Sequence, residues 1–157
     1  MGADEQKRIY LVVIDDSPEA RVALRFAARR AAKTGGGIEV LGIVEAQDFV
    51  QFGGVQAAIE EEQRLRIAGV VSSAVGEILD EAGIEATIIV QHGEPVKAVR
   101  EYVGDRQEVA ALVLGAAPSG EPGPLVGHFT GNDVGKLPCP VMLIPGGLSD
   151  ERLEQLS

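Results

Sequence analysis

Short apolar segments alternate with longer helical stretches along the chain, and this alternation constrains the fold more than any other feature. The apolar segments are rich in Val, Ile and Leu and are bounded by glycine, proline or charged residues, which is typical of buried strands. Strands that alternate with helices form parallel βαβ units with right-handed crossovers. We therefore expect an α/β three-layer sandwich with a mostly parallel, five-stranded sheet. The expected strands are residues 9–14, 38–44, 86–90, 110–114 and 141–144.

The segments between these strands carry signals for helices and loops. Ser17 can cap a helix that has Pro18 at its first position, and the glycines after Thr34 would end it. Glycine- and proline-rich stretches predict loops, and the polar segment at residues 146–157 is expected to be a mobile tail. The expected helices are residues 18–33, 56–82, 96–103 and 127–136, with loops at 45–54 and 115–126.

Length and charge narrow the function classes. The 157 residues suit a single domain over 1–157, and the net charge of −10 disfavours nucleic acid and anionic membranes as partners. No apolar run approaches the roughly 18 residues of a membrane span, and the N-terminus lacks the apolar core of a signal peptide. Cys139 is the only cysteine, so it cannot form an intramolecular disulfide and is expected to be a structural thiol. These features predict a cytoplasmic protein with no nucleic-acid or membrane partner.

The first strand and the turn after it, VVIDDSPEAR at residues 12–21, resemble two families. One is the response-regulator receiver domain, in which an acidic pair holds Mg²⁺. A receiver also needs a phospho-accepting aspartate after its third strand and a lysine after its fifth. Here Gln91 and His92 follow the third strand and no lysine follows Ile144, so the receiver interpretation is rejected.

The other family is that of the universal stress proteins, whose first strand ends in an aspartate. Three further segments resemble this family in order and spacing: HGEP at residues 92–95, LVLG at 112–115 and PCPV at 138–141. The resemblance spans nearly the whole chain and is closest to single-domain bacterial members. It implies an adenine-nucleotide alpha-hydrolase-like sheet with strand order 3-2-1-4-5.

Many members of this family bind ATP through a loop of Gly, two residues, Gly, nine residues and Gly-Ser/Thr. Gly115 fits the first glycine and Gly127 the last, with His128 at the hydroxyl position. Pro118 replaces the second glycine, and the loop is one residue shorter than the pattern. The nucleotide-binding residues that the resemblance implies are Val13, Ile14, Asp15, Ile43, Leu114, Gly115, Gly127, His128, Phe129 and Thr130.

The resemblance implies a cytoplasmic stress-response homodimer that binds ATP or AMP, with Mg²⁺ on Asp15 or Asp16. Its subunits would pair through the edge strand from Val141 to Ile144. The alternative is a nucleotide-free dimer whose acidic surface binds a protein partner. Enzyme motifs are absent from the sequence, so we expect no catalysis beyond weak ATP hydrolysis, and no histidine or cysteine pair stands at metal-ligand spacing.

Several of these residues also have a purely structural interpretation. Asp15 can contact a nucleotide or cap the start of the following helix, and Asp16 can be an exposed turn residue. Ile43 can meet adenine through its backbone or be part of the core. Phe49 and Phe52 can cover a ligand or fold back on the core.

Overall fold

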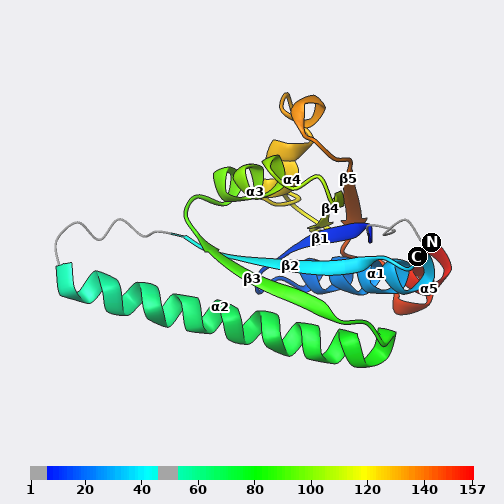
Figure 1. The fold of residues 1–157 in the computed structure, drawn as a ribbon, viewed down its shortest axis with the longest axis horizontal. Helices are drawn as coiled ribbons and strands as arrows, with labels where there is room; N and C mark the ends of the chain where they lie inside the picture. Colours follow the sequence, from blue (N-terminus) through cyan, green and yellow to red (C-terminus); the bar gives the residue numbers. More distant parts are fainter. Residues whose placement is uncertain (1–6, 46–52) are drawn as a thin grey trace, which may run out of the picture.

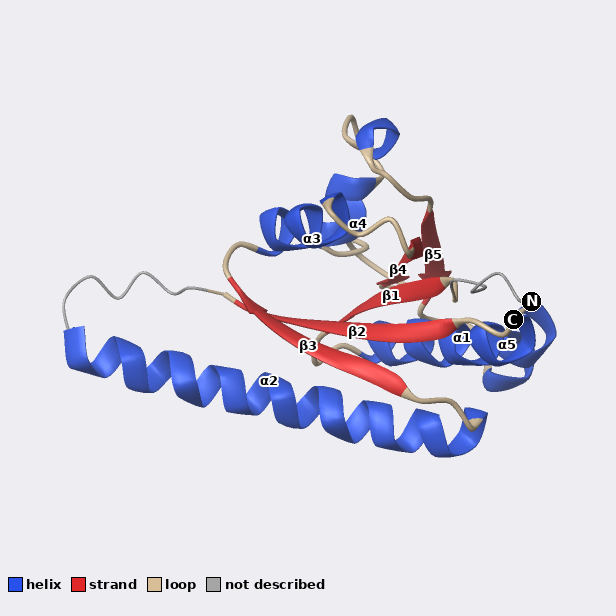
Figure 2. Cartoon of the chain, viewed as in Figure 1, coloured by secondary structure: helices blue, strands red, loops and turns tan. Residues whose placement is uncertain are grey.

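The computed structural model describes residues 7–45 and 53–157 and shows one parallel sheet of five strands. The strand order is β3-β2-β1-β4-β5, which confirms the predicted α/β fold and its topology. Figure 1 and Figure 2 show the sheet between two layers of helices. The strands are β1 (Ile9–Ile14), β2 (Gly37–Val44), β3 (Ala86–His92), β4 (Val109–Ala116) and β5 (Val141–Pro145).

The helices divide between the two faces as the crossovers require. The helices α1 (Pro18–Thr34) and α2 (Gly53–Ala82) cover one face, and α3 (Pro95–Gly104) and α4 (Pro124–Phe129) cover the other (Figure 1). Right-handed crossovers place helices on one face while the chain moves outward from β1 to β3, and on the opposite face once it returns to β4 and β5.

Strand residues alternate between two apolar cores, one on each face of the sheet. On β1, Val12 and Ile14 pack on the α1 and α2 side, whereas Leu11 and Val13 pack on the α3 and α4 side. All four side chains are at least 90% buried, as expected for a central strand of a parallel sheet. This arrangement confirms that the near-continuous apolar run at residues 9–14 is a fully covered strand.

The first helix begins and ends as the sequence predicts. Ser17 is the N-cap and its hydroxyl oxygen accepts a hydrogen bond from the Ala20 N–H at 3.3 Å, with Pro18 at the first helical position. Gly35 has φ +71° and forms the left-handed C-cap. The N-cap Ser17 holds the N-terminus of α1 directly after β1, at the carboxyl edge of the sheet.

The segment between β4 and β5 differs from the predicted loop over 115–126 and helix over 127–136. The helix α4 begins three residues earlier, at Pro124, and ends at Phe129, after which only a 3₁₀ turn at Val134–Lys136 follows. Proline is favoured at the first position of a helix because its missing N–H has no partner there. Gly131 and Gly135 disfavour continuation of the helix through the following residues.

The C-terminal segment is helical, so the expected mobile tail is wrong. The helix α5 (Asp150–Leu156) begins at the cap Ser149, whose hydroxyl accepts a hydrogen bond from the Arg152 N–H at 3.1 Å. Leu153 is 1% exposed in the core beside α1, and Arg29 forms an ion pair with Asp150 at 2.8 Å. The helix cap, the buried Leu153 side chain and the Arg29–Asp150 ion pair together hold this polar segment against α1.

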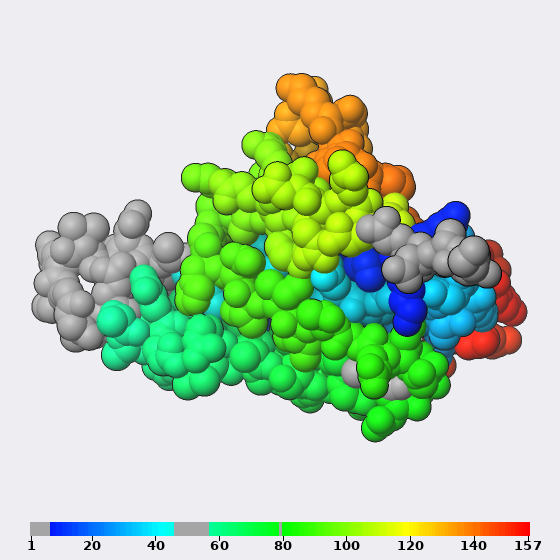
Figure 3. Space-filling model, viewed as in Figure 1, coloured from blue at the N-terminus to red at the C-terminus, as the bar shows by residue number. Residues whose placement is uncertain are grey.

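The longest element, α2, extends past the end of the sheet at its N-terminal side (Figure 1), and its first turns lie at one end of the space-filling view (Figure 3). Within the described residues, none of the helices combines the length and apolar character needed to cross a membrane.

Candidate functional site

The carboxyl ends of β1, β2 and β4 meet at one edge of the sheet, where the strand order reverses. In parallel sheets of this kind, ligands bind in the crevice outside these strand ends. Two cavities lie at this edge in the structure. One is under the loop that follows β4, and the other is between the end of β2 and α2.

The cavity under the loop measures about 70 Å³, far below the roughly 300–1,000 Å³ of typical small-molecule sites. Four of the predicted residues line it: Val13, Asp15, Leu114 and Gly115. The structure therefore brings these residues together as the resemblance implies, but it leaves little space among them. Ile14 points to the opposite face and is buried in the core beside α1.

Asp15 has a local partner in the turn before α1. Its Oδ1 atom accepts hydrogen bonds from the Ser17 N–H, at 2.8 Å, and from the Ser17 hydroxyl. The Ser17 hydroxyl oxygen in turn caps α1. This chain of contacts matches the structural interpretation of Asp15, in which its carboxylate stabilises the start of the helix.

Gly115 lies where β4 touches the first turn of α1. A Cβ atom at this position would be 2.2 Å from the carbonyl oxygen of Glu19, which no side chain can tolerate. Gly146, after β5, is similarly close to Glu19 and to Ala116. The close packing of strand ends on α1 therefore requires glycine at position 115, whether or not a phosphate binds nearby.

The four predicted phosphate-binding residues after the loop lie within α4 and at its C-terminal end. The Gly127 N–H donates to Gly123 O at 3.0 Å, and the Thr130 N–H and hydroxyl donate to Val126 O at 3.1 and 2.7 Å. Phe129 is fully buried. Because α4 begins at Pro124, Gly127 and Thr130 use their N–H groups inside the helix and its cap.

His128 contacts residues of other elements. Its Nε2 atom is 2.8 Å from Arg100 Nη2 on α3 and 3.0 Å from Asp133 Oδ2, and Arg100 also pairs with Asp133 at 2.6 Å. Glu94, in the predicted turn at 92–95, caps α3 by accepting the Val96 and Lys97 N–H groups, and these donors lower the pKa of its carboxyl. His128 therefore links α4 to α3 and to Asp133, and Glu94 has its partners within the first turn of α3.

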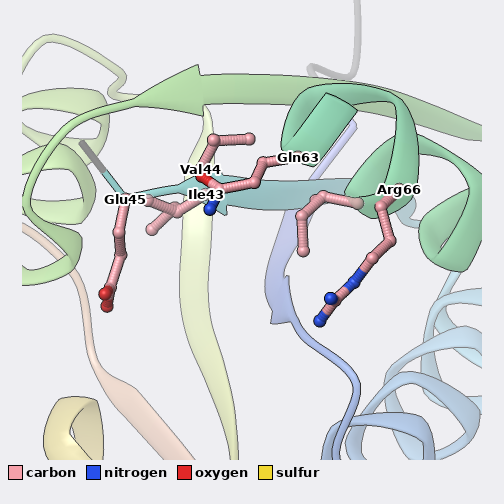
Figure 4. Close-up of a pocket in the computed structure, with 6 residues that line it drawn as sticks. Ile43, Val44, Glu45, Gln63 and Arg66 are labelled. Carbon is pink, nitrogen blue, oxygen red and sulfur yellow. The ribbon is translucent and has the colours of Figure 1, made fainter. Parts of the chain in front are cut away.

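The cavity between β2 and α2 is larger, at about 290 Å³ (Figure 4). It contains the predicted residue Ile43 and combines apolar side chains with three polar ones. Glu45 and Arg66 lie on opposite sides of the cavity, so its two ends differ in charge. The lining residues are Ile43, Val44, Glu45, Gln63, Arg66 and Ile67.

Close packing of α2 on β2 places the polar residues at this cavity. A Cβ atom on Gly42 would lie 2.8 Å from Cγ2 of Ile67, so the missing side chain allows the helix to approach the strand. Gln63 and Arg66 precede Ile67 by four residues and by one, and they reach the same region of the sheet edge. Sequence reasoning missed both residues, although a glycine within a buried strand signals such a close approach.

Asp16 and Arg66 join the end of β1 to α2. Arg66 Nη2 donates to Asp16 Oδ2 at 2.9 Å, and the two side chains are 52% and 70% exposed. One oxygen of Asp15 therefore contacts Ser17 and one oxygen of Asp16 contacts Arg66, so each carboxylate of the expected Mg²⁺ site has a protein partner. Across the described ranges, no group of three or more His, Cys, Asp and Glu side chains could hold a metal ion.

A third cavity, of about 300 Å³, lies beside α3 near the end of edge strand β3 and includes Tyr102 and Arg106. Its arginine is already paired with Glu39, at 2.6 Å, and with Glu108. The cavity also lies at the end of β3, one strand farther from the reversal between β1 and β4 than the cavity at β2. We therefore give it less weight as a ligand site than the cavity at β2.

Phe49, Phe52 and Cys139 are the other residues that the sequence singles out. Phe49 and Phe52 lie outside the described residues. Cys139 is partly buried beside the core under α3 and α4, and this burial raises the pKa of its thiol. A raised pKa is consistent with a structural cysteine, because it lowers the fraction of reactive thiolate.

Residues 7–145 match the model of the Universal stress protein family. Similar solved structures include the universal stress protein UspA from Lactobacillus plantarum, with 16% identity, coverage of 88% of this chain and 98% of that chain, and a TM-score of 0.73. A universal stress protein from Archaeoglobus fulgidus in complex with dAMP has 22% identity, 88% and 97% coverage, and a TM-score of 0.56.

A universal stress protein in complex with cAMP has 19% identity, covers 89% of this chain and 98% of that chain, and has a TM-score of 0.58. At these levels of identity, the likenesses establish the fold. No curated protein sequence matches the chain.

Proposed function

Because the chain belongs to the universal stress protein family, we propose that it is a stress-response protein that binds an adenine mononucleotide such as AMP. The binding site in this proposal is the cavity between β2 and α2. One observation carries it: about 290 Å³ of space opens at the carboxyl edge of the sheet, beside Ile43. Since adenine nucleotides are intracellular metabolites, the proposal also places the protein in the cytoplasm.

The size of the cavity and the chemistry of the loop favour one phosphate over three. A volume of about 290 Å³ is at the lower end of the range for small-molecule sites. Pro118, Pro122 and Pro124 remove N–H donors from the loop that would hold a triphosphate, and α4 already uses the N–H groups of Gly127 and Thr130. Both nucleotides in the related complexes, dAMP and cAMP, carry a single phosphate.

The lining residues supply the two kinds of contact that a nucleotide needs. Ile43 and Ile67 offer apolar surface for the base, while Gln63 and Glu45 offer an amide and a carboxylate for its amino group or for ribose hydroxyls. Among the described residues that line the cavity, none is a nucleophile paired with a base. We therefore propose binding without catalysis and without Mg²⁺.

A nucleotide-free interaction protein is the second candidate, and one observation favours it. The cavity under the loop that follows β4 measures about 70 Å³. The close packing of β4 against Glu19 explains why position 115 is glycine without any ligand. In this alternative, the acidic surface of the protein would bind a protein partner.

Both candidates include a homodimer formed through β5. This strand pairs only with β4 in the described sheet, so its other edge is open, and Leu143 on it is 40% exposed. An apolar edge strand of this kind requires cover, and antiparallel pairing with a second copy across a twofold axis supplies it.

Calorimetric titration with AMP, ATP and GMP tests the nucleotide proposal. We expect saturable binding of AMP in the micromolar range and weaker binding of ATP. The variant Gln63→Trp would fill the cavity and remove AMP binding, whereas Glu62→Trp, at the neighbouring exposed position, would not. Absence of binding at millimolar nucleotide would support the nucleotide-free alternative. ATP binding that survives Gln63→Trp but is lost in Gly127→Arg would place the ligand in the glycine loop instead.

A further inference from the structure

Arg66 of α2 is positioned to receive an anion at the carboxyl edge of the sheet. We propose that Arg66 binds the phosphate of the nucleotide and that Asp16 occupies the same guanidinium when the site is empty. The proposal rests on the proposed function, because it assigns the phosphate end of the same ligand. It gives the chain a phosphate-binding residue outside the glycine loop.

The charge distribution at this edge supports Arg66 as the phosphate ligand. Among the described residues that line the two cavities, Arg66 is the only basic one, whereas Asp15, Glu19 and Glu45 are acidic. The chain carries a net charge of −10, so its long-range field does not attract a phosphate, and a cation at the site itself is needed. A guanidinium offers five N–H donors in a planar fork that suits phosphate oxygens.

The geometry leaves Arg66 available for this contact. In Figure 4 its side chain extends from α2 on one side of the cavity, and Glu45 lies on the opposite side. Asp16 is its acceptor among the described residues, through a single contact from Nη2 at 2.9 Å. The remaining donors of the fork are therefore free of described protein acceptors. A ligand with its phosphate at Arg66 would extend its base toward Ile43, and Glu45 would stay apart from the phosphate.

The Asp16–Arg66 pair is exchangeable because both side chains are largely exposed, at 52% and 70%. Solvent screens such pairs, and their contribution to an equilibrium amounts to no more than about fivefold. A phosphate monoester carries up to two negative charges and can engage the fork at two points, so it competes well for the guanidinium. On binding, the Arg66 guanidinium would exchange its contact with the Asp16 carboxylate for a contact with the phosphate in the same cavity.

This exchange predicts effects of opposite sign for the two partners. Arg66→Gln removes the cation and is expected to weaken AMP binding about tenfold or more, as for a lost hydrogen bond to a charged group. Asp16→Asn removes the competing carboxylate and is expected to strengthen AMP binding roughly threefold. Adenosine has no phosphate, so both variants should bind it within about twofold of the wild-type affinity.

The experiment is calorimetric titration of the wild-type chain, Arg66→Gln, Asp16→Asn and a control with AMP and with adenosine. Arg64→Gln is the matched control, because Arg64 is on the same helix, pairs with Glu61 and does not line the cavity. Thermal denaturation of each variant verifies that the fold is intact. We expect AMP to bind more tightly than adenosine in the wild type and the control, and to lose this advantage in Arg66→Gln.

Four results would count against the proposal, and they differ in what else they affect. If adenosine and AMP bind equally well to the wild type, or if Arg64→Gln weakens AMP as much as Arg66→Gln, Arg66 does not bind the phosphate while the nucleotide proposal stands. If Asp16→Asn weakens AMP binding, Asp16 does not compete for Arg66. If neither ligand binds at millimolar concentration, the proposed function itself fails and this assignment falls with it.

Discussion

Gly115 lies at the end of β4 against the first turn of α1, where there is no space for a side chain. The substitution Gly115→Ala would put a Cβ atom 2.2 Å from Glu19 O and force the backbone apart. We expect it to lower the free energy of unfolding by about 1–3 kcal/mol, as for other overpacked sites. Urea denaturation followed by circular dichroism measures this change.

Gly127 is the matched control for Gly115 because both come from the predicted glycine loop. A Cβ atom on Gly127 would meet nothing within 4 Å, and the residue lies inside α4. We expect Gly127→Ala to be neutral or to stabilise the protein by up to about 1 kcal/mol. Equal destabilisation by the two substitutions would show that the packing account of Gly115 is wrong.

Arg106 neutralises a buried carboxylate on the α3 side of the sheet. Glu39 is 7% exposed, its Oε1 accepts from Arg106 at 2.6 Å, and its Oε2 accepts no hydrogen bond from the described residues. This contact also raises the pKa of the arginine. We expect Arg106→Met to cost about 3 kcal/mol, because the Glu39 charge would stay buried without its partner. Chemical denaturation gives the value.

The double variant Glu39→Leu/Arg106→Met separates the ion pair from the other contacts of Arg106. With both charges removed, most of the lost stability should return, since an apolar pair does not incur the desolvation cost of a buried charge. A double variant as unstable as Arg106→Met would mean that the arginine acts through its contacts with Tyr102 and Glu108 instead.

At the scale of elements, α5 depends on one buried side chain. Leu153 is 1% exposed beside α1, whereas Leu156, one turn later, is 43% exposed. We expect Leu153→Ala to destabilise the protein by about 2–3 kcal/mol and Leu156→Ala by less than about 0.5 kcal/mol. Thermal denaturation of the two variants compares them directly. If both lie within error of the wild type, α5 does not contribute to the folded core.

Elements were predictable from the sequence where local signals decide them. The strands at 9–14 and 141–144 and the cap at Ser17 depend on composition and on neighbours in the chain, and the structure has them where expected. The start of α4 was missed because each of Pro118, Pro122 and Pro124 can begin or end a helix. The packing of Val126 and Phe129 in the core, which the local sequence does not reveal, selects Pro124. The site residue Arg66 was missed because its partner Asp16 is 50 positions away.

At the scale of the whole molecule, the open edge of β5 predicts a homodimer. We expect the wild-type chain to have the mass of a dimer in light scattering coupled to gel filtration. Leu143→Lys should convert it to a monomer, because a charge would enter an apolar strand pairing. Leu65→Lys makes the same charge change on α2, at a position 58% exposed, and should leave the dimer intact. A monomeric wild type would contradict the prediction.

The position of the nucleotide can be mapped by following the backbone amides of the ¹⁵N-labelled protein during a titration with AMP. Binding in the cavity between β2 and α2 predicts saturable shifts of the residues that line it, Ile43, Val44, Glu45, Gln63 and Arg66. Shifts confined to residues 115–130, or to the cavity of Tyr102 and Arg106, would contradict binding at this site, as would a spectrum that millimolar AMP leaves unchanged.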